Sequence, residues 1–358
     1  MSDMSGLDIL FSPRSLLKAP VMRAAYSDRT AWLMSAMAEL AYYQFEDKDL
    51  VSTLALELAQ ISNVDDIKSK LSEILTGNTG GGDIDTLKKI LTVAGFELVN
   101  AYNRNETQGF LVKRNGDGND PGMLVLAFRG TELVPKDIHS DADAVMVELN
   151  GAEEVHRGFL NAFKHVKGEI KRDLEEHSGI PVYITGHSLG GALAIIATRL
   201  LVSSSTGACY TFGSPRVGNH LVDDQIKTPI YRIINASDIV PRVPFAYITN
   251  GLIWVSRMFH LEPVAKFLRK FKGYVHYGDM RYLPYVAAGP DDTYPGLALH
   301  SNPTILYRGL QLAKRWIATM GKAAVQDHSI SIYREKLRAY ALVREKVGQI
   351  TSIKENME

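Results

Sequence analysis

The sequence predicts an α/β protein in which helices cover both faces of a largely parallel sheet. Strand-like stretches occur at 96–101, 108–113, 123–128, 181–185, 208–213, 229–234 and 274–283. Helical stretches at about 157–177 and 190–203 lie between several of them, and this alternation is typical of a parallel sheet. A third observation is a strand that leads directly into a glycine-rich turn and a helix at 181–194.

The N-terminal part is expected to be helical, because Trp32, Leu33 and Leu40 recur at helical spacing. A second helix is predicted from about Leu54 to Leu75, a glycine-rich loop at 76–82, and a short helix capped by Asp83. We therefore predict one domain over residues 1–358, built of three parts. These are a helical N-terminal extension (1–95), a catalytic core (96–242 and 273–358) and a cap or lid insertion within about 243–325.

Composition excludes several functional classes. Forty basic residues balance forty acidic ones, so no overall field attracts nucleic acid. Cys209 is the only cysteine, which excludes an internal disulfide and a cysteine zinc site and fits a reducing compartment. The first residues carry Asp3 and Asp8 where a signal peptide carries basic residues, and no run of ~18 apolar residues occurs. We expect a cytoplasmic protein as synthesised, with secretion by a signal-peptide-independent route left open, and no metal or cofactor.

The segment around Ser188 carries the strongest chemical signal. An apolar strand at 181–185 runs into Gly-x-Ser-x-Gly at 186–190, and a small-residue helix follows. Glycine at Gly186 and Gly190 avoids side chains that would collide with strand and helix, while the serine projects above the sheet. The helix start supplies backbone N–H groups where negative charge develops. This pattern predicts the nucleophile elbow of an α/β-hydrolase, with Ser188 as nucleophile.

The acid should follow the serine in the chain, because the order in this fold is nucleophile, acid, base. Asp238 lies just past the strand at 229–234, which is the second strand after Ser188. Asp223 and Asp224 precede that strand, on what reads as a solvated helix end. The sequence therefore favours Asp238.

Four histidines follow this acid: His260, His276, His300 and His328. The stretch around His276 alternates like a strand, and His260 and His300 fall in the insertion. His328 falls in a loop before the C-terminal helix, from which an imidazole can reach the serine. We predict that His328 takes the Ser188 proton while Asp238 holds the imidazole tautomer.

The oxyanion site is predicted from a third segment. An apolar strand at 123–128 ends in a turn that carries Thr131. We assign the Thr131 backbone N–H and hydroxyl, with the Leu189 backbone N–H as partner. The alternative for Thr131 is a purely structural turn or cap residue.

These residues belong to a larger set of ordered motifs that resembles the class 3 (fungal-type) lipase family. The matching stretches are Ala127–Thr131, Val155–Phe159, Thr185–Ala194, Thr211–Asn219, Asn235–Pro241, and Asp327-His328 with Tyr333. They occur in the family's order and span roughly residues 96–335. The resemblance implies hydrolysis of acylglycerol or phospholipid esters, no metal or organic cofactor, and a mobile lid.

Two departures from the family are visible. Its secreted fungal members use disulfides, which a chain with Cys209 alone cannot form. Where those members carry an apolar lid helix after the oxyanion turn, this chain has the polar stretch 136–143. This difference argues against a lid built from the same element and against a preference for triacylglycerol droplets.

The insertion between acid and base is long and basic. From Leu252 to Gln326 it has ten Lys or Arg against four Asp or Glu. Residues 263–273 predict an amphipathic helix with a basic face, and a second helix is expected after Asn302-Pro303. Two interpretations stay open: a cap helix packed on the core, or a helix that lies in a membrane interface and contacts anionic headgroups.

The sequence thus predicts a serine carboxylic-ester hydrolase acting on lipid esters, as an acylglycerol lipase or a phospholipase A1, through an acyl-enzyme. The alternative is a catalytically idle lipase-like module that binds lipid or a partner. The presence of Ser188, Asp238 and His328 favours the enzyme.

Overall fold

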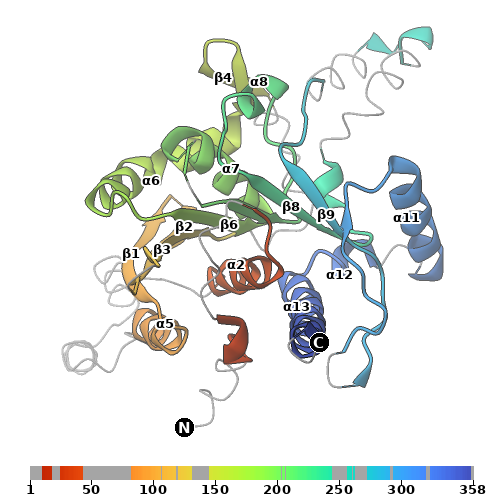
Figure 1. Ribbon diagram of the computed structural model, residues 1–358. Helices are drawn as coiled ribbons and strands as arrows, with labels where there is room; N and C mark the ends of the chain where they lie inside the picture. The colour runs from red at the N-terminus through yellow and green to blue at the C-terminus, as the bar shows by residue number, and fades with distance from the viewer. Residues whose placement is uncertain are drawn as a thin grey trace, which may run out of the picture.

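The computed structural model describes most of the chain (Figure 1). The described residues are 10–17, 25–42, 82–105, 107–117, 120–130, 145–202, 204–205, 207–243, 256–259, 261–262, 272–290, 293–319 and 323–355. Several expectations lie outside them. These are the helix at 54–75, almost all of the loop at 76–82, Thr131, the polar stretch 136–143, and all but the last two residues of 263–273.

A mainly parallel sheet forms the centre of the molecule. Its strand order is β1-β2-β3-β6-β7-β8-β9-β10. The bounds are β1 (Glu97–Arg104), β2 (Thr107–Arg114), β3 (Met123–Phe128), β6 (Val182–His187), β7 (Cys209–Phe212), β8 (Ile230–Asn235), β9 (Asp279–Leu283) and β10 (His300–Ser301). Strands β3, β6, β7, β8 and β9 are parallel, whereas β1, β2 and β10 are added antiparallel at the edges. The predicted α/β class is therefore confirmed.

Helices cover both faces of this sheet (Figure 1). Helices α2 (Asp28–Leu40), α5 (Gly82–Val93) and α13 (Ile330–Glu355) pack on one face, and α6 (Arg157–Glu176) and α7 (Leu189–Leu201) on the other. The five parallel strands are largely buried, as expected where helices cover both faces. Because parallel strands end at the same edge, the loops after β6, β7 and β8 meet there.

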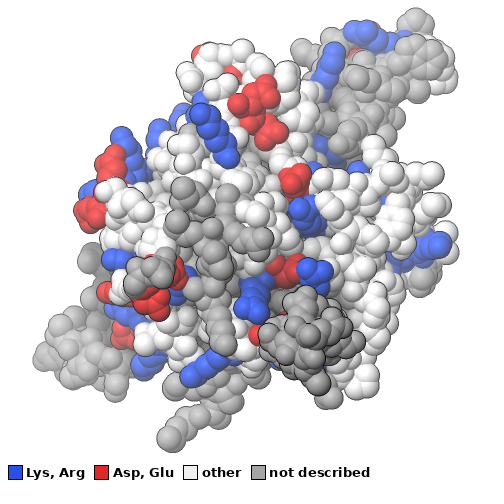
Figure 2. All heavy atoms as spheres, viewed as in Figure 1, with Lys and Arg blue, Asp and Glu red and all other residues white. Residues whose placement is uncertain are grey.

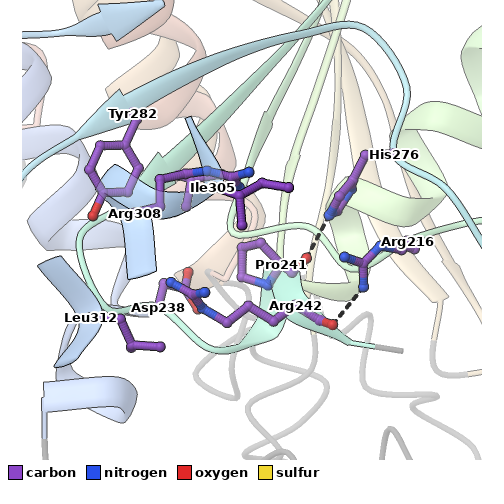
Figure 3. A pocket seen from close by; sticks show the side chains of 10 residues that line it. Arg216, Asp238, Pro241, Arg242, His276, Tyr282, Ile305, Arg308 and Leu312 are labelled. Atoms are coloured by element: carbon purple, nitrogen blue, oxygen red, sulfur yellow. Dashed lines mark hydrogen bonds between the residues drawn. The ribbon is translucent and has the colours of Figure 1, made fainter. Parts of the chain in front are cut away.

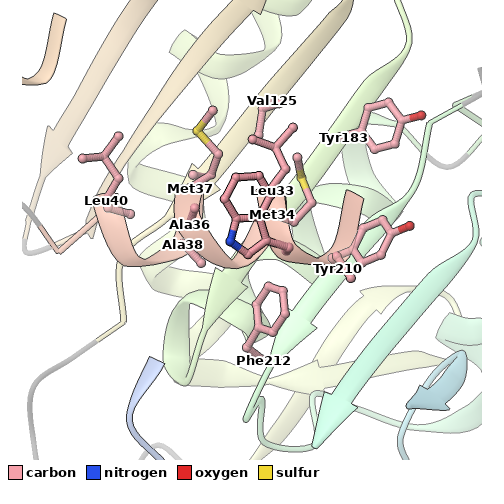
Figure 4. Close-up of a cluster of buried hydrophobic side chains, with 14 of the residues drawn as sticks. Leu33, Met34, Ala36, Met37, Ala38, Leu40, Val125, Tyr183, Tyr210 and Phe212 are labelled. Atoms are coloured by element: carbon pink, nitrogen blue, oxygen red, sulfur yellow. The ribbon is translucent and has the colours of Figure 1, made fainter. Parts of the chain in front are cut away.

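Helix α2 belongs to the core and not to an appended segment. Met34 is fully buried against the sheet (Figure 4), and Trp32 is fully buried in the same hydrophobic cluster; burial of a side chain such as Met34 contributes about 1.5–3 kcal/mol. The Thr185 hydroxyl of β6 donates to the Met34 carbonyl at 3.0 Å. At its start, the Ser27 side chain accepts the Thr30 N–H, which is an N-cap. The predicted N-terminal extension thus contributes a helix that completes the sheet's hydrophobic face.

Smaller elements differ from the sequence-based expectations. A two-stranded sheet of β4 (Met146–Asn150) and β5 (Glu153–His156) was not predicted, nor was the short β10. Helix α5 begins at Gly82, so Asp83 lies in its first turn and not at the N-cap position. Short strands and helix ends carry the weakest periodic signals.

The remaining described elements are short or lie in the insertion. They are η1 (Arg14–Leu17), α8 (His220–Asp223), η3 (Val240–Arg242), α11 (Ile305–Thr319) and α12 (Ala323–Gln326). Helix α11 lies beside β9 and β10 at the edge of the sheet (Figure 1). Within the described ranges, no helix has the length and apolar character needed to cross a membrane.

Candidate active site

Ser188 occupies a strained turn between β6 and α7. Its φ of +57° and ψ of −126° lie in a region that residues other than glycine rarely adopt. Two backbone hydrogen bonds hold the turn: Ser188 N–H donates to Phe212 O at 2.9 Å, and Gly191 N–H donates to Ser188 O at 3.0 Å. The serine therefore stands at the junction of strand and helix, where the motif predicted it.

The two flanking glycines are required by close backbone contacts. A Cβ at Gly186 would collide with the backbone of Gly190, and a Cβ at Gly190 would collide with the carbonyl oxygen of Phe128 at the end of β3. The close approach of strand, turn and helix therefore leaves no room for side chains at these positions.

Asp238 and His328 form a hydrogen-bonded pair beside this turn. Asp238 follows β8, and His328 lies between α12 and α13. The His328 Nδ1 lies 2.9 Å from Asp238 Oδ2 and 3.0 Å from Oδ1. The Asp238 carboxylate is fully buried and also accepts the Val240 N–H at 2.9 Å and the Tyr333 hydroxyl at 2.6 Å. These donors fix the carboxylate, so it can orient the imidazole.

Gly213, at the end of β7, makes space for this pair. Its φ is +57°, and a Cβ there would lie 2.6 Å from Asp238 Oδ2 and 3.0 Å from His328 Nδ1. Three neighbouring strands, β6, β7 and β8, therefore supply Ser188, the space at Gly213 and Asp238 in turn.

The Ser188 hydroxyl makes no hydrogen bond within the described part of the chain, and Ser188 is 2% exposed. The structure thus joins acid and base directly and places the nucleophile on the adjacent turn without a bond to the imidazole. Serine–histidine bonds in ligand-free hydrolases are often long and shorten when substrate binds.

His187, which the motif treats as a variable position, holds the loop of His328. Its Nε2 lies 2.6 Å from the His328 carbonyl oxygen, and its Nδ1 lies 2.7 Å from the Tyr42 hydroxyl. A carbonyl only accepts, so Nε2 carries the proton and Nδ1 accepts from Tyr42. Burial, followed by the nearby His328, lowers the pKa of His187 well below its usual value and keeps it neutral.

The predicted oxyanion donors lie on two segments. Leu189 is the first residue of α7. A Cβ at Gly130 would lie 3.2 Å from Ser188 Cβ and 2.5 Å from His187 O, so the turn after β3 contacts the nucleophile. Thr131, the next residue, is outside the described ranges, and its assignment remains a prediction.

A buried polar network supports the acid loop. The Tyr333 hydroxyl oxygen accepts the Asn235 N–H at 2.9 Å, and Lys336 Nζ donates to Asn235 Oδ1 at 2.7 Å and to Pro284 O at 3.1 Å. Burial lowers the pKa of Lys336 to about 8, against the opposing influence of Asp327. Nothing in the sequence singled out Lys336, because a lysine in a C-terminal helix is usually solvated.

The other candidate histidines are positioned differently. The expectation that His276 belongs to a strand is wrong: β9 begins at Asp279, and the His276 Nε2 donates to Pro241 O at 2.5 Å. Gly278, whose φ is +68°, interrupts the extended backbone immediately before β9 begins. His300 is in β10, and His260 lies outside the described ranges. No cluster of three or more metal-binding side chains is found in the described residues.

The elbow after a central parallel strand, with an acid after β8 and a histidine before the last helix, defines an α/β-hydrolase. A family model described as "Lipase (class 3)" matches residues 125–248. This part of the chain is similar to the class 3 lipases, and the match includes Ser188 and Asp238.

Curated relatives and solved structures are similar over part of their length. Triacylglycerol lipase OBL1 of Arabidopsis thaliana is 31% identical over 180 residues, covering 35% of each chain. A lipase of Rhizomucor miehei is 34% identical over 146 residues, covering 36% of this chain and 39% of that protein. The structure of mono- and diacylglycerol lipase from Aspergillus oryzae has a TM-score of 0.43 at 23% identity, covering 60% of this chain and 73% of that one. The chain thus spans little more than a third of the length of these two curated relatives.

Proposed function

We propose that this protein is a serine carboxylic-ester hydrolase that acts on acylglycerols through Ser188, His328 and Asp238. The observation that supports it best is the buried Asp238–His328 pair beside a serine held at positive φ. Strain of this kind persists only where the surrounding structure enforces it and occurs most often at active sites. The similar proteins include triacylglycerol lipases and mono- and diacylglycerol lipases, which supports the same substrate class.

The proposed reaction proceeds through an acyl-enzyme. His328 Nε2 takes the proton of Ser188 Oγ as that oxygen attacks the ester carbonyl, and Asp238 stabilises the resulting imidazolium. The Leu189 and Thr131 backbone N–H groups bind the oxyanion. Collapse of the tetrahedral intermediate breaks the ester bond, and His328 protonates the departing alkoxide. Water then repeats the sequence and releases the fatty acid.

Phospholipase A1 activity is a finer proposal on the same site, supported by the basic insertion. An interfacial role for residues 263–273, one of the two interpretations that the sequence leaves open, remains a proposal, since this segment lies almost wholly outside the described ranges. Helix α11 adds support from the described part. Its exposed apolar side chains include Leu306 at 74% and Ile317 at 75% exposure, and the helix carries no acidic residue. In Figure 2 the surface over α11, at the right of the view, is mostly uncharged. Such a surface fits adsorption to a lipid interface.

The catalytic proposal is tested by Ser188→Ala and Asp238→Asn, with Ser178→Ala as a matched control on an exposed turn. Removal of a triad member typically lowers kcat by ~10⁴ or more. We expect a fluorophosphonate probe to label wild type and Ser178→Ala, but not Ser188→Ala. A wild-type protein that neither labels nor cleaves a soluble p-nitrophenyl ester would instead be an idle lipid-binding module.

The interfacial proposal is tested by changing Leu306 and Ile317 together to Gln, with Val343→Gln as control. Val343 is also a large exposed apolar residue, at 60% exposure, but it lies on α13. We expect the double variant to lose activity on emulsified acylglycerol and on phospholipid vesicles and to keep activity on a soluble ester. An equal loss of activity on the lipid substrates and on the soluble ester would indicate damage to the core and contradict an interfacial role. The ratio of the two lipid activities in wild type distinguishes acylglycerol lipase from phospholipase A1.

A further inference from the structure

A pocket of about 270 Å³ lies between the end of β8, the short helix η3 and α11 (Figure 3). Asp238 contributes to its lining, so the pocket adjoins the candidate active site. Its volume is just below the range of small-ligand sites, ~300–1,000 Å³. The catalytic proposal does not use this pocket.

Three arginines from distant segments meet in the lining: Arg216, Arg242 and Arg308. Arg216 Nη1 donates to the Arg242 carbonyl oxygen at 2.6 Å, which ties two of the segments together. Within the described residues, the Arg242 and Arg308 guanidinium groups make no hydrogen bond or ion pair, although the Nε of each is buried. Buried donors without acceptors are energetically unfavourable, so an acceptor in the pocket would stabilise them.

The lining has a clear excess of positive charge. Among the described lining residues, Asp238 is the only acidic one, and the Asp238 oxygens already accept from His328, Tyr333 and the Val240 N–H. His276 adds no charge, because burial and the neighbouring arginines lower its pKa well below the usual value. Burial also lowers the pKa of Arg242, and the nearby Arg308 acts in the same direction. An anion would relieve both the desolvation and the mutual repulsion of these cations.

Apart from His276 and the Tyr282 hydroxyl, which donates to Ala236 O, the rest of the described lining is apolar. Ile305 and Leu312 of α11 face the pocket together with Arg308 on the same helix (Figure 3). A site for a fully hydrated inorganic ion would be expected to present polar groups on every side. Guanidinium groups next to aliphatic walls match a molecule that has an anionic oxygen group at one end and an alkyl chain at the other.

We propose that this pocket binds the anionic group of an amphiphile, a carboxylate or phosphate, with Arg242 and Arg308 as ligands and the adjoining alkyl chain against Ile305 and Leu312. A released fatty acid and a phospholipid headgroup share this chemistry. Charge-assisted hydrogen bonds from a guanidinium group suit a carboxylate and a phosphate alike, because either group presents two or more anionic oxygens side by side.

Isothermal titration calorimetry on the full chain tests the pocket. Decanoate, decanol, decyl phosphate and inorganic phosphate are titrated below their micelle concentrations into wild type, Arg308→Met, Arg308→Lys and Lys314→Met. Lys314 is an exposed cation on the same helix and serves as the matched control. We expect decanoate or decyl phosphate to bind wild type and Lys314→Met equally. Arg308→Met should bind about tenfold more weakly, the effect of losing one charge-assisted hydrogen bond, and Arg308→Lys should lie between.

The ligand series identifies the source of the anion. Preference for decanoate assigns the site to a fatty acid, and preference for decyl phosphate assigns it to a phospholipid headgroup. Binding of decanol as tight as that of decanoate would overturn recognition of charge. Binding that is unchanged in Arg308→Met would place the ligand elsewhere, for example in the acyl site beside Ser188, and would also overturn the proposal. Circular dichroism of each variant confirms that the compared proteins are folded.

Discussion

The Asp327 carboxylate accepts the backbone N–H of Ser237 at 2.9 Å from its Oδ2. Asp327 immediately precedes His328, and Ser237 immediately precedes Asp238. The loops that carry the candidate base and acid are therefore joined one residue upstream of the catalytic pair, and Arg315 lies 3.6 Å from the other carboxylate oxygen. Because Asp327 is buried, this junction is shielded from water and is correspondingly rigid.

The junction predicts different effects for two substitutions at Asp327. Asp327→Ala leaves the Ser237 N–H without an acceptor and Arg315 without its carboxylate, which should lower the free energy of unfolding by about 3–5 kcal/mol. Asp327→Asn keeps an acceptor for Ser237 and should retain more of kcat. Urea unfolding and hydrolysis of a soluble ester measure both quantities. Equal kcat in the two variants would show that the Ser237 bond does not position the pair.

We predict that replacing His187 lowers the turnover rate without weakening substrate binding. His187→Ala removes the donor to the His328 carbonyl, so the imidazole loses its support. We expect kcat to fall by about 10- to 100-fold, a typical consequence of small misplacement, with KM little changed. His187→Gln, which restores an N–H donor, should recover part of the loss.

The Tyr42 hydroxyl provides the control for this assignment. Tyr42→Phe keeps the ring but removes the donor to His187 Nδ1, so the bond to His328 remains and the fall in kcat should be smaller. A larger effect at Tyr42 than at His187 would contradict the proposed chain of support.

We predict that a side chain at Gly213 lowers esterase activity, and that this loss can be separated from the effect of backbone strain. Gly213→Ala introduces a Cβ 2.6 Å from Asp238 Oδ2 at a φ of +57°. Gly151 also has a positive φ, +62°, but a Cβ there would have no neighbour within 4 Å, so Gly151→Ala isolates the cost of the conformation, about 1–2 kcal/mol. We expect both variants to lose stability and only Gly213→Ala to lose most of its esterase activity. Comparable activity in the two would show that the pair tolerates displacement.

The lowered pKa of Lys336 leads us to predict that the free energy of unfolding rises at alkaline pH. Its pKa is lowered to about 8 in the folded protein, whereas a lysine in an unfolded chain titrates near ~10.4. Below pH 8 both states are protonated and the burial penalty is fully present. Between these values the unfolded state binds more protons, so the free energy of unfolding increases with pH.

The measurement compares wild type with Lys336→Met from pH 7 to 10.5. The wild-type free energy of unfolding should gain about 3 kcal/mol relative to the variant across this interval. A constant difference between the two curves would show that Lys336 titrates normally and is not desolvated.

The turn at Ser188 and the order of the candidate catalytic residues could be predicted from the sequence, because the turn has a recognisable glycine pattern and the order follows from the parallel sheet. Gly186 is required by contacts with the backbone of Gly190 and Gly191, and Gly190 by contacts with the backbone of Phe128 and Arg129 at the end of β3. A parallel sheet then restricts where an acid and a base can follow, and this restriction selected Asp238 and His328. The largely buried strands and the periodic helices likewise carry their own signals.

Contacts between distant segments were decided by the tertiary structure alone. Helix α2 reads as an extension in the sequence, yet Tyr42 just beyond its end reaches His187, 145 residues away. In the sequence, Lys336 and the arginines of the pocket look like solvated charges. Their burial depends on which distant segments pack against them, and hydrophobic periodicity carries no information about those contacts. Sequence by itself therefore determined which residues are the candidates for catalysis, and tertiary packing determined which groups hold them in place and where basic side chains gather beside them.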